Sequence, residues 1–250
     1  MFDKNKSNKA LKEVQEILSE NNTEYKVFEE KNDANSYIDH DLVLVIGGDG
    51  SMLSAAKLFS HINCPFLGVN LGKVGFMADL DSENLATELP EVLSGNNLVE
   101  DKEAISCSYN GKKYTAFNEI VLHTQKSYKL MHFELKIEGN LIYRKRADGL
   151  IISTSNGSTA YSLSAGGPIL SPDVNGLVIT SLNPLSLSAR PLIVPSSAKI
   201  EVSLIKTPND LNSFIIIDAY KVFACSYFLV IIRSSYFYNF ILSNKGFISY

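Results

Sequence analysis

An uninterrupted apolar segment followed at once by a glycine-rich turn constrains the fold of this chain more than any other feature. Leu42 to Ile46 is a continuous apolar run rich in β-branched residues, which is typical of a buried strand in a parallel sheet. Gly47-Gly48-Asp49-Gly50 follows directly, and the pattern then predicts a helix over Met52–Phe59 and a second strand over Phe66–Val69. Because two parallel strands joined by a helix are the building unit of doubly wound sheets, the first part of the chain is predicted to be α/β.

Two more elements are expected ahead of this unit. Apolar residues recur at helical spacing over residues 11–18 among Lys and Glu, which predicts a surface helix ending near Asn21-Asn22. Tyr25–Phe28 is predicted to form a short strand.

The pattern changes near residue 100, where alternating β-type segments replace the helical spacing. We therefore expect residues 1–100 to form an α/β domain with a parallel sheet, and residues 101–250 to form a mostly β domain. Asn110-Gly111 and Gly139-Asn140 are typical of hairpin turns. Val222–Ile232 is the longest uncharged apolar run, and it is predicted to be a buried strand because a membrane span needs about 20 residues. The other strands predicted in this part are Ile105–Tyr109, Tyr114–Leu122, Met131–Ile137, Leu141–Arg144, Gly149–Ser153, Leu177–Thr180, Lys199–Ile205 and Phe214–Ile217.

Composition limits the partners that this chain can have. Of 250 residues, 45% are hydrophobic, which is enough for the core of one large domain or two smaller ones. The net charge of −4 argues against nucleic-acid binding and favours small-molecule partners. The three cysteines and four histidines have no metal-ligand spacing, so no metal site built from protein ligands is expected. Residues 1–8 are polar and basic rather than apolar, so we expect a cytoplasmic protein without a membrane part.

The segment Gly47-Gly48-Asp49-Gly50-Ser51 is the first candidate for chemistry. Glycines between a strand and a helix let backbone N–H groups approach phosphates, and a helix N-terminus favours negative charge. A carboxylate in such a turn is useful where it accepts a proton from a hydroxyl or helps to hold a metal ion, so Asp49 is our candidate base. The alternative is a plain Gly-Asp-Gly turn with Ser51 as the helix cap. The segment matches neither a Walker loop nor a Rossmann fingerprint.

Two further segments have polar residues where strands end. Asn70-Leu71-Gly72-Lys73-Val74-Gly75-Phe76 follows the next strand, so its glycines are expected beside the first loop, unless it is an ordinary strand-to-helix connection. Asn118-Glu119 sets an amide beside a carboxylate, which could bind sugar hydroxyls or a base edge. Such a pair at a strand end is also often only solvated.

The richest polar stretch runs from Asp148 to Pro168. It passes from a buried strand into a long series of small Gly, Ser and Thr residues and then into an expected helix. Small hydroxyl donors beside glycines suit close approach of a ligand, and the alternative is a simple loop. Just before it, Arg144, Lys145 and Arg146 could contact phosphates or form a solvated face.

The chain resembles the NAD kinase family over roughly residues 40–205, in the order of its motifs and in their residue types. These motifs are the Gly47–Gly50 turn, Asn118-Glu119 and the 157–167 stretch. Diacylglycerol and sphingosine kinases and phosphofructokinases have a similar Gly-Gly-Asp-Gly, so the specific part of the resemblance is the Asp148–Pro168 segment. The resemblance implies transfer of the γ-phosphate of ATP to the 2′-hydroxyl of the adenosine ribose of NAD, giving NADP, with a divalent cation such as Mg²⁺ assisting. It also implies a homo-oligomer whose β-rich domain completes the site across subunits.

The same resemblance implies roles for individual residues. Asp49 would be the general base, Gly50 and Phe76 would line the NAD site, and Asp148 would meet the nicotinamide end. Asn118 and Glu119 would bind the nucleoside portions. The resemblance also implies that adenine and ribose are held by Thr159, Ala160, Tyr161 and Ser164. The other residues expected to bind the nucleotides are Gly47, Gly48, Arg146, Ser162 and Leu163.

Two departures from the family pattern keep other functions open. Family members usually begin with an extra strand and a nucleotide-facing loop, whereas this chain starts in the helix that contains Leu11. Family members usually have Asp-Gly-Gln or a similar triplet where this chain has Asp218-Ala219-Tyr220. The alternatives are therefore a lipid or sugar kinase that shares the Gly-Gly-Asp-Gly turn, and an inactive nucleotide-binding remnant.

Overall fold

The computed structural model describes residues 4–28, 34–37, 39–59, 61–72, 77–78, 80–95, 97–109, 111–124, 129–205, 213–225 and 229–242. The chain divides into two compact units. The first takes the described residues up to Asp101 together with the end of the last strand from Tyr238, and the second is Lys102–Phe237.

The first unit is a three-layer α/β arrangement around a short parallel sheet. Its elements are α1 (Lys4–Glu20), η1 (Ala34–Ser36), β1 (Val43–Ile46), α2 (Asp49–Leu58), β2 (Phe66–Asn70), β3 (Leu80–Asp81) and α3 (Leu85–Leu93). β1 pairs in parallel with β2 from Val43 opposite Phe66 to Ile46 opposite Val69, and β3 also pairs in parallel with β2. Near the other end of β2, Phe240 of β15 (Leu229–Leu242) lies opposite Phe66.

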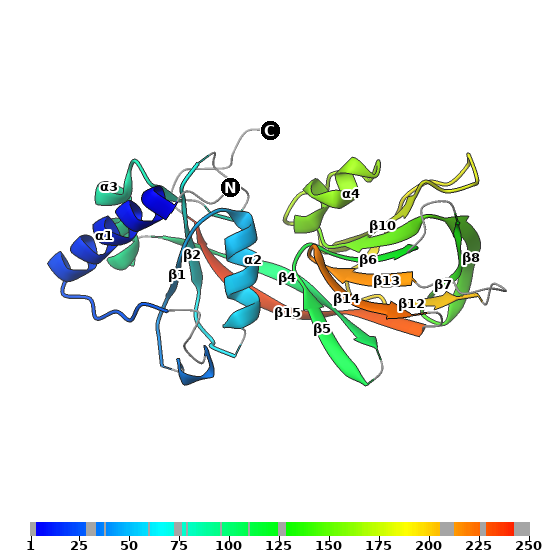
Figure 1. Cartoon of the computed structure of the whole chain (residues 1–250), viewed down its shortest axis with the longest axis horizontal. Helices are drawn as coiled ribbons and strands as arrows, with labels where there is room; N and C mark the ends of the chain where they lie inside the picture. The colour runs from blue at the N-terminus through cyan, green and yellow to red at the C-terminus, as the bar shows by residue number, and fades with distance from the viewer. Residues whose placement is uncertain are drawn as a thin grey trace. The chain divides into compact units, whose positions relative to one another are not determined.

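Alternation along β2 assigns its two faces to different helices. Leu67 and Val69 are fully buried against α1 and α3 in one apolar cluster. Gly68 points the other way, where a Cβ atom would lie 2.8 Å from the Met52 sulfur of α2. Figure 1 shows α2 on one side of β1 and β2 and the other two helices on the opposite side. The glycine-rich turn therefore leads from β1 into α2, and among the described helices α2 covers this face of the sheet by itself.

The second unit is a β-sandwich made of two antiparallel sheets (Figure 1). One sheet has the strand order β11-β10-β9-β6-β13-β14, and the facing sheet has β15-β12-β7-β8, with β4 and β5 attached through β15. Alternate residues of both sheets fill the core, among them Phe133, Leu150 and Ile200, all with no exposed surface. The strands are β4 (Leu98–Tyr109), β5 (Lys112–Ala116), β6 (Glu119–Thr124), β7 (Met131–Ile137), β8 (Asn140–Ala147), β9 (Gly149–Ser153), β10 (Gly176–Leu182), β11 (Leu192–Pro195), β12 (Ile200–Leu204), β13 (Ser213–Ile217) and β14 (Tyr220–Cys225). The 3-10 helix η2 (Asn156–Thr159) and the short helix α4 (Tyr161–Ser164) follow β9.

The predicted fold class, an α/β part followed by a mostly β part, is confirmed, and so is the parallel strand-helix-strand unit. The strand β1 is only half-buried, contrary to the prediction. Among the described strands it is the edge strand of its sheet and pairs only with β2. The helix α3 was not predicted. It contains Pro90, which donates no backbone hydrogen bond, but its buried Leu85, Leu89 and Val92 pack with α1 and hold it in place.

Three strand predictions are wrong in detail. Tyr25–Phe28 forms no strand, and the Phe28 ring packs edge-on against Phe59, with ring centroids 5.1 Å apart. Tyr114–Leu122 is divided between β5 and β6, since the chain passes there from one sheet to the other. Val222–Ile232 is likewise divided between β14 and β15, and residues 226–228 lie outside the described residues.

The predicted Gly139-Asn140 hairpin joins β7 and β8, but its turn begins one residue earlier. Glu138 and Gly139 have φ angles of 50° and 76°, so they form the two-residue turn, and Asn140 is already paired with Ile137.

The hairpin between β13 and β14 has two consecutive non-glycine residues in the left-handed region. Asp218 and Ala219 have φ angles of 42° and 67°, and Ile217 pairs with Tyr220 on either side of them. An L-residue with a Cβ atom is strained in this conformation, whereas glycine is not. The family pattern, Asp-Gly-Gln, has glycine at the second position of this turn. Ala219 therefore adopts the left-handed conformation at a cost in stability.

Replacing Ala219 with Gly should therefore stabilise the protein. Ala219 is exposed, so no packing is lost, and we expect the free energy of unfolding to rise by about 0.5–1 kcal/mol, measured by urea denaturation. The matched control is Ala55→Gly in the interior of α2, which should lower it by about 1 kcal/mol. Equal destabilisation by both changes would contradict the strain at Ala219.

Candidate active site

The glycine-rich turn is fixed to the sheet and opens toward free space. The Gly47 N–H donates to the Val69 carbonyl at 2.8 Å, which ties the turn to β2. Gly48 is the N-cap residue of α2, and Ser51 lies within the first turn of the helix. The alternative of Ser51 as the helix cap is therefore wrong. A Cβ atom on Gly48 or Gly50 would meet nothing within 4 Å. These two glycines are thus not required by packing within the described chain, and the space before them suits a ligand at a helix N-terminus.

Asp49 is the first residue of α2, and its side chain is half-buried. Its Oδ1 accepts hydrogen bonds from the backbone N–H groups of Met77 and Ala78, at 3.0 and 3.3 Å. The carboxylate therefore joins the glycine-rich turn to the residues that follow the second glycine loop. Lys73–Phe76 lie outside the described residues, and the expected role of Phe76 stays a prediction.

The start of the second loop is held by its own asparagine. Asn70, only 5% exposed, accepts the Gly72 N–H on Oδ1 at 3.0 Å. Asn70 ends β2, next to the strand that leads into Gly47, so both loops begin at the same end of the parallel pair.

In the second unit, Asn118 and Glu119 lie where the chain changes sheets. The Asn118 carbonyl accepts the Thr154 N–H at 2.9 Å, and the Phe117 carbonyl accepts the Thr154 hydroxyl at 2.6 Å. The Asn118 side chain is half-buried and its Oδ1 accepts from the Asn156 amide at 2.8 Å. With Oδ1 engaged in this bond, the group that Asn118 can direct toward another partner is its side-chain NH₂.

The stretch after β9 packs tightly onto this segment. Gly157 is buried so close to Asn118 that a Cβ atom would lie 2.1 Å from the Asn118 carbonyl oxygen. Its N–H donates to the Thr154 hydroxyl at 3.0 Å. Gly157, which has no side chain, therefore lets two backbone segments come together.

The predicted nucleotide-binding residues 159–164 differ in exposure. Tyr161 and Leu163 are 44% and 42% exposed. Ser162 has no exposed surface, and its hydroxyl lies 3.3 Å from the Thr180 hydroxyl. The side chain of Ser162 thus serves internal packing. The other predicted residues of this stretch are partly or largely exposed: Thr159, Ala160, Tyr161, Leu163 and Ser164.

Asp148 and Arg146 lie at the other end of β9 from Asn118. Glu119 is paired with Ser153, whereas Asp148 precedes Gly149, the residue paired with His123. Five residues of extended strand separate the two places, roughly 17 Å. Asp148 accepts the Asn183 side-chain amide at 2.9 Å. The described fold thus brings Asn118 and Glu119 to the 154–164 stretch and does not bring Asp148 to them.

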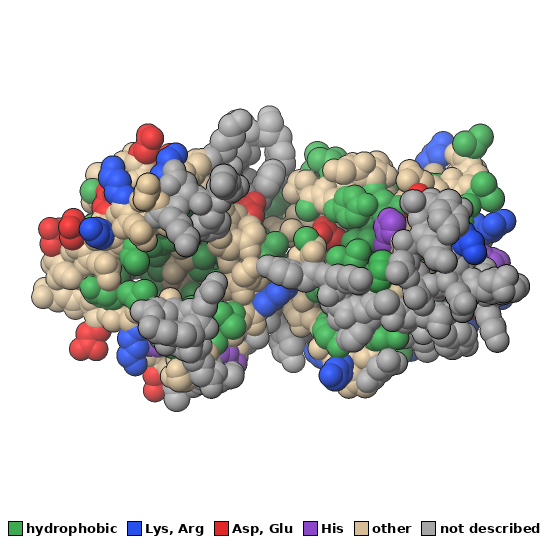
Figure 2. Space-filling model, viewed as in Figure 1, with side chains coloured by type: hydrophobic (Ala, Val, Ile, Leu, Met, Phe, Trp, Pro, Cys, Tyr) green, Lys and Arg blue, Asp and Glu red, His purple; other side chains and the backbone are tan. Residues whose placement is uncertain are grey.

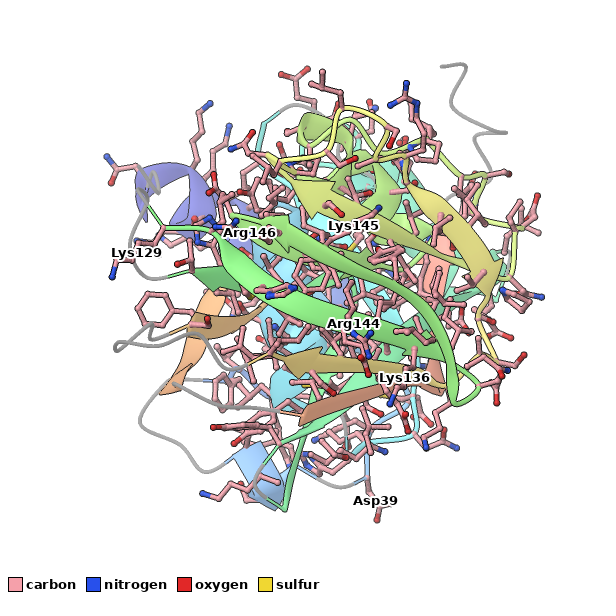
Figure 3. All side chains as sticks on the ribbon, turned by 90° about the vertical axis from the view of Figure 1, so that its right-hand side faces the viewer. Asp39, Lys129, Lys136, Arg144, Lys145 and Arg146 are labelled. Atoms are coloured by element: carbon pink, nitrogen blue, oxygen red, sulfur yellow. The ribbon has the colours of Figure 1, made fainter. Side chains whose placement is uncertain are left out.

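The three basic residues of β8, labelled in Figure 3, make different contacts. Arg144 pairs with Glu134 at 2.7 Å, and Lys136 pairs with the same carboxylate at 3.0 Å, which lowers the pKa of Glu134. The Lys145 ammonium lies 3.8 Å from the Tyr143 ring centroid, and desolvation lowers the pKa of Lys145. Among the ion pairs of the described residues none involves Arg146, and its expected contact with a nucleotide stays a prediction.

Burial also acts on the tyrosine beneath this run. Burial raises the pKa of Tyr143 to about 12, because loss of water disfavours the charged phenolate.

One residue of this region was not singled out as functional from the sequence. The Asp218 carboxylate accepts the backbone N–H groups of Phe117, Asn118 and Glu119, at 2.9, 2.8 and 3.0 Å. The available signal was its position directly after the predicted strand Phe214–Ile217, where a polar residue ends a buried segment.

Sequence profiles of known families match both parts of the chain. The ATP-NAD kinase N-terminal domain matches residues 2–97, and the ATP-NAD kinase C-terminal domain matches residues 117–242. The chain belongs to the NAD kinase family.

Individual members of the NAD kinase family agree with this. The NAD kinase of Methanothermobacter thermautotrophicus is 42% identical over 169 residues, which cover 68% of this chain and 60% of that protein. The NAD kinase of Erwinia tasmaniensis is 44% identical over 177 residues, which cover 69% of this chain and 61% of that protein. The chain thus spans about three fifths of the length of these relatives.

Two solved NAD kinase family structures have the same fold. An NAD kinase from Archaeoglobus fulgidus in complex with ATP superposes with a TM-score of 0.79 and 27% identity, covering 94% of this chain and 90% of that one. Yeast NADH kinase complexed with NADH superposes with a TM-score of 0.77 and 28% identity, covering 82% of this chain and 64% of that one.

Proposed function

We propose that this chain is an NAD kinase that transfers the γ-phosphate of ATP to the 2′-hydroxyl of the adenosine ribose of NAD. The observation that carries the proposal is Asp49 in an open glycine turn at the N-terminus of α2, in a chain that matches both NAD kinase domains. Members of the family have been solved with ATP and with NADH.

Each group has a defined task in this reaction. The N–H groups at the start of α2 favour the negative charge of the phosphates. Asp49 accepts the proton of the attacking 2′-hydroxyl, whose oxygen then bonds to the γ-phosphorus as ADP leaves. Asn118 donates its side-chain NH₂ to the nucleoside, and the exposed Tyr161 offers a ring for stacking. The protein thus contributes mainly positioning and electrostatic stabilisation.

A divalent cation is part of the proposal. Among the described residues, no group of three His, Cys, Asp or Glu side chains could hold a metal ion. Mg²⁺ is usually bound by substrate phosphates together with one or two carboxylates, so the cation would enter with ATP and be held mainly by its phosphates. When bound, the cation neutralises phosphate charge.

The direct test measures NADP formation from NAD, ATP and Mg²⁺ by purified protein. Diacylglycerol, sphingosine and fructose 6-phosphate are offered in parallel as acceptors, because lipid and sugar kinases share the Gly-Gly-Asp-Gly turn. We expect NADP alone to form. Phosphorylation of another acceptor without NADP would replace this proposal, and a folded protein that binds NAD without turnover would be an inactive remnant.

We also place the protein in the cytoplasm. Cys64 and Cys107 are buried free thiols in the described structure, as suits a reducing compartment. In the part of the chain that the structure describes, no helix is long and apolar enough to cross a membrane.

A homo-oligomer completes the proposal, and an exposed apolar loop supports it. After β10, Leu185 and Leu187 are 63% and 94% exposed, and Ile193 on β11 is 56% exposed. Green side chains mark the tip of this loop in Figure 2. The Leu185 N–H donates to the Arg146 carbonyl at 2.9 Å, so the loop lies beside the predicted residues Arg146 and Asp148. A second copy that covers this loop would place its own residues near them.

Replacing Leu187 with Asp should therefore weaken the oligomer. A charge at the centre of an apolar contact costs several kcal/mol, so we expect the mass from light scattering at micromolar concentration to fall toward that of one chain. The matched control is Leu98→Asp, at a leucine 58% exposed in the first unit, which should leave the mass unchanged. An oligomer that survives the Leu187→Asp change would remove this loop from the interface.

A further inference from the structure

We propose that Asp218 is a positioning residue for the reaction, which holds the backbone of residues 117–119 so that Asn118 and Glu119 meet the nucleotide. This inference rests on the proposed function. Asp218 itself lies behind that segment, is 4% exposed, and is not proposed to touch the substrate.

The first step of the argument is the number of amides that one carboxylate engages. Oδ2 of Asp218 accepts the Phe117 N–H at 2.9 Å. Oδ1 accepts both the Asn118 N–H at 2.8 Å and the Glu119 N–H at 3.0 Å. Three consecutive backbone donors thus point at one buried anion, and hydrogen bonds to a charged acceptor are stronger than those between neutral groups.

The second step is that the same segment is held from its other side. The Thr154 hydroxyl donates to the Phe117 carbonyl at 2.6 Å, and the Thr154 N–H donates to the Asn118 carbonyl at 2.9 Å. Donor groups and acceptor groups of 117–119 are therefore both engaged, so the direction of the Asn118 side chain is fixed. Reacting partners must be placed to within about an ångström, and this segment meets that need.

The third step is that the hairpin turn itself is bonded to the segment. The Asp218 N–H donates to the Glu119 carbonyl at 3.1 Å, so both the backbone and the side chain of Asp218 engage Glu119. The turn between β13 and β14 and the three accepted amides therefore hold the same segment.

A carboxylate is required because it only accepts hydrogen bonds. Asn has the same shape but replaces one oxygen with an NH₂ donor, which would face a backbone donor. We expect Asp218→Asn to raise the KM for NAD about tenfold or more and to leave the KM for ATP within about twofold. Exchange of the Phe117, Asn118 and Glu119 amide hydrogens should accelerate about tenfold or more relative to the Ile179 amide of β10.

Two other variants separate positioning from loss of stability. Ile215→Val removes a methyl group from the same hairpin without touching the carboxylate, and it should leave both KM values and the relative exchange of residues 117–119 unchanged. Asp218→Glu keeps the charge but shifts it by one methylene group, so its KM for NAD should lie between those of the wild type and the Asn variant. If the Asn variant does not fold, the Glu variant carries the test.

Each outcome decides one statement. A wild-type KM for NAD in both Asp218 variants, or an equal rise with Ile215→Val, would overturn the positioning role. A wild-type chain that makes no NADP would overturn the proposed function instead. Amide exchange needs no substrate, so in that case unchanged exchange in the Asp218 variants would still refute the hold on 117–119, and faster exchange would support it.

Discussion

Replacing Asp49 with Asn is expected to lower kcat for NADP formation by about 10²- to 10⁴-fold, with the Kd for NAD changed less than about twofold. The amide cannot accept the proton of the 2′-hydroxyl at neutral pH. Its remaining oxygen can still accept the Met77 and Ala78 N–H groups, which now donate to Oδ1 at 3.0 and 3.3 Å. The fold around the turn should therefore persist, and the loss should fall on the chemical step.

The control for this prediction is the same chemical change at a carboxylate with a similar local role. Asp81 accepts the Glu83 N–H at 3.0 Å in the same unit and lies outside the glycine loops. Asp81→Asn should keep kcat within about twofold. The two variants are compared by initial rates at saturating NAD and ATP, with NAD binding measured by calorimetry. Near-normal turnover by the Asp49→Asn enzyme with unchanged NAD binding would exclude Asp49 as the base.

Local patterns were sufficient to predict the parts of the site that are built from neighbouring residues. The apolar run before Gly47 predicted β1, and the glycines after it predicted a turn into a helix, because strand, turn and helix are all specified within about 20 residues. The degree of burial of β1 could not be obtained in this way. It depends on how many strands lie beside β1, which is a property of the sheet rather than of the run.

Contacts between distant residues could not be predicted from one sequence. Asp218 is about 100 residues from Phe117, Asn118 and Glu119, and no local spacing links them. The triplet that starts at Asp218 departs from the family pattern, yet the carboxylate of its first residue accepts three backbone N–H groups of the segment that the resemblance assigns to the nucleotide. The small residues of the Asp148–Pro168 segment predict close approach of a ligand, but their sequence does not reveal that Gly157 packs against the Asn118 backbone.

Replacing Gly157 with Ala is expected to have the largest effect on stability. The added Cβ atom would lie 2.1 Å from the Asn118 carbonyl oxygen and 2.5 Å from its carbon. Both are backbone atoms that no side-chain rotation can move, so Asn118 or η2 must shift. We expect the free energy of unfolding to fall by about 3 kcal/mol and Tm to fall by roughly 6–12 °C. Because Asn118 would move, the KM for NAD should rise about tenfold or more, measured well below Tm.

The matched control is Gly176→Ala at the start of β10, in the same unit. A Cβ atom there would meet only side-chain ends of Leu170, Ile193 and Val174, at 3.3–3.4 Å. These groups can move by a few tenths of an ångström, so stability should change by less than about 1 kcal/mol and the KM for NAD should not change. If Gly157→Ala lowers Tm but keeps the wild-type KM, the contact serves the fold and Asn118 tolerates the shift. If it changes neither Tm nor the KM for NAD, the close approach of Gly157 to Asn118 does not exist in solution. The proposal that residues 117–119 are held in one position would then lose this contact as evidence.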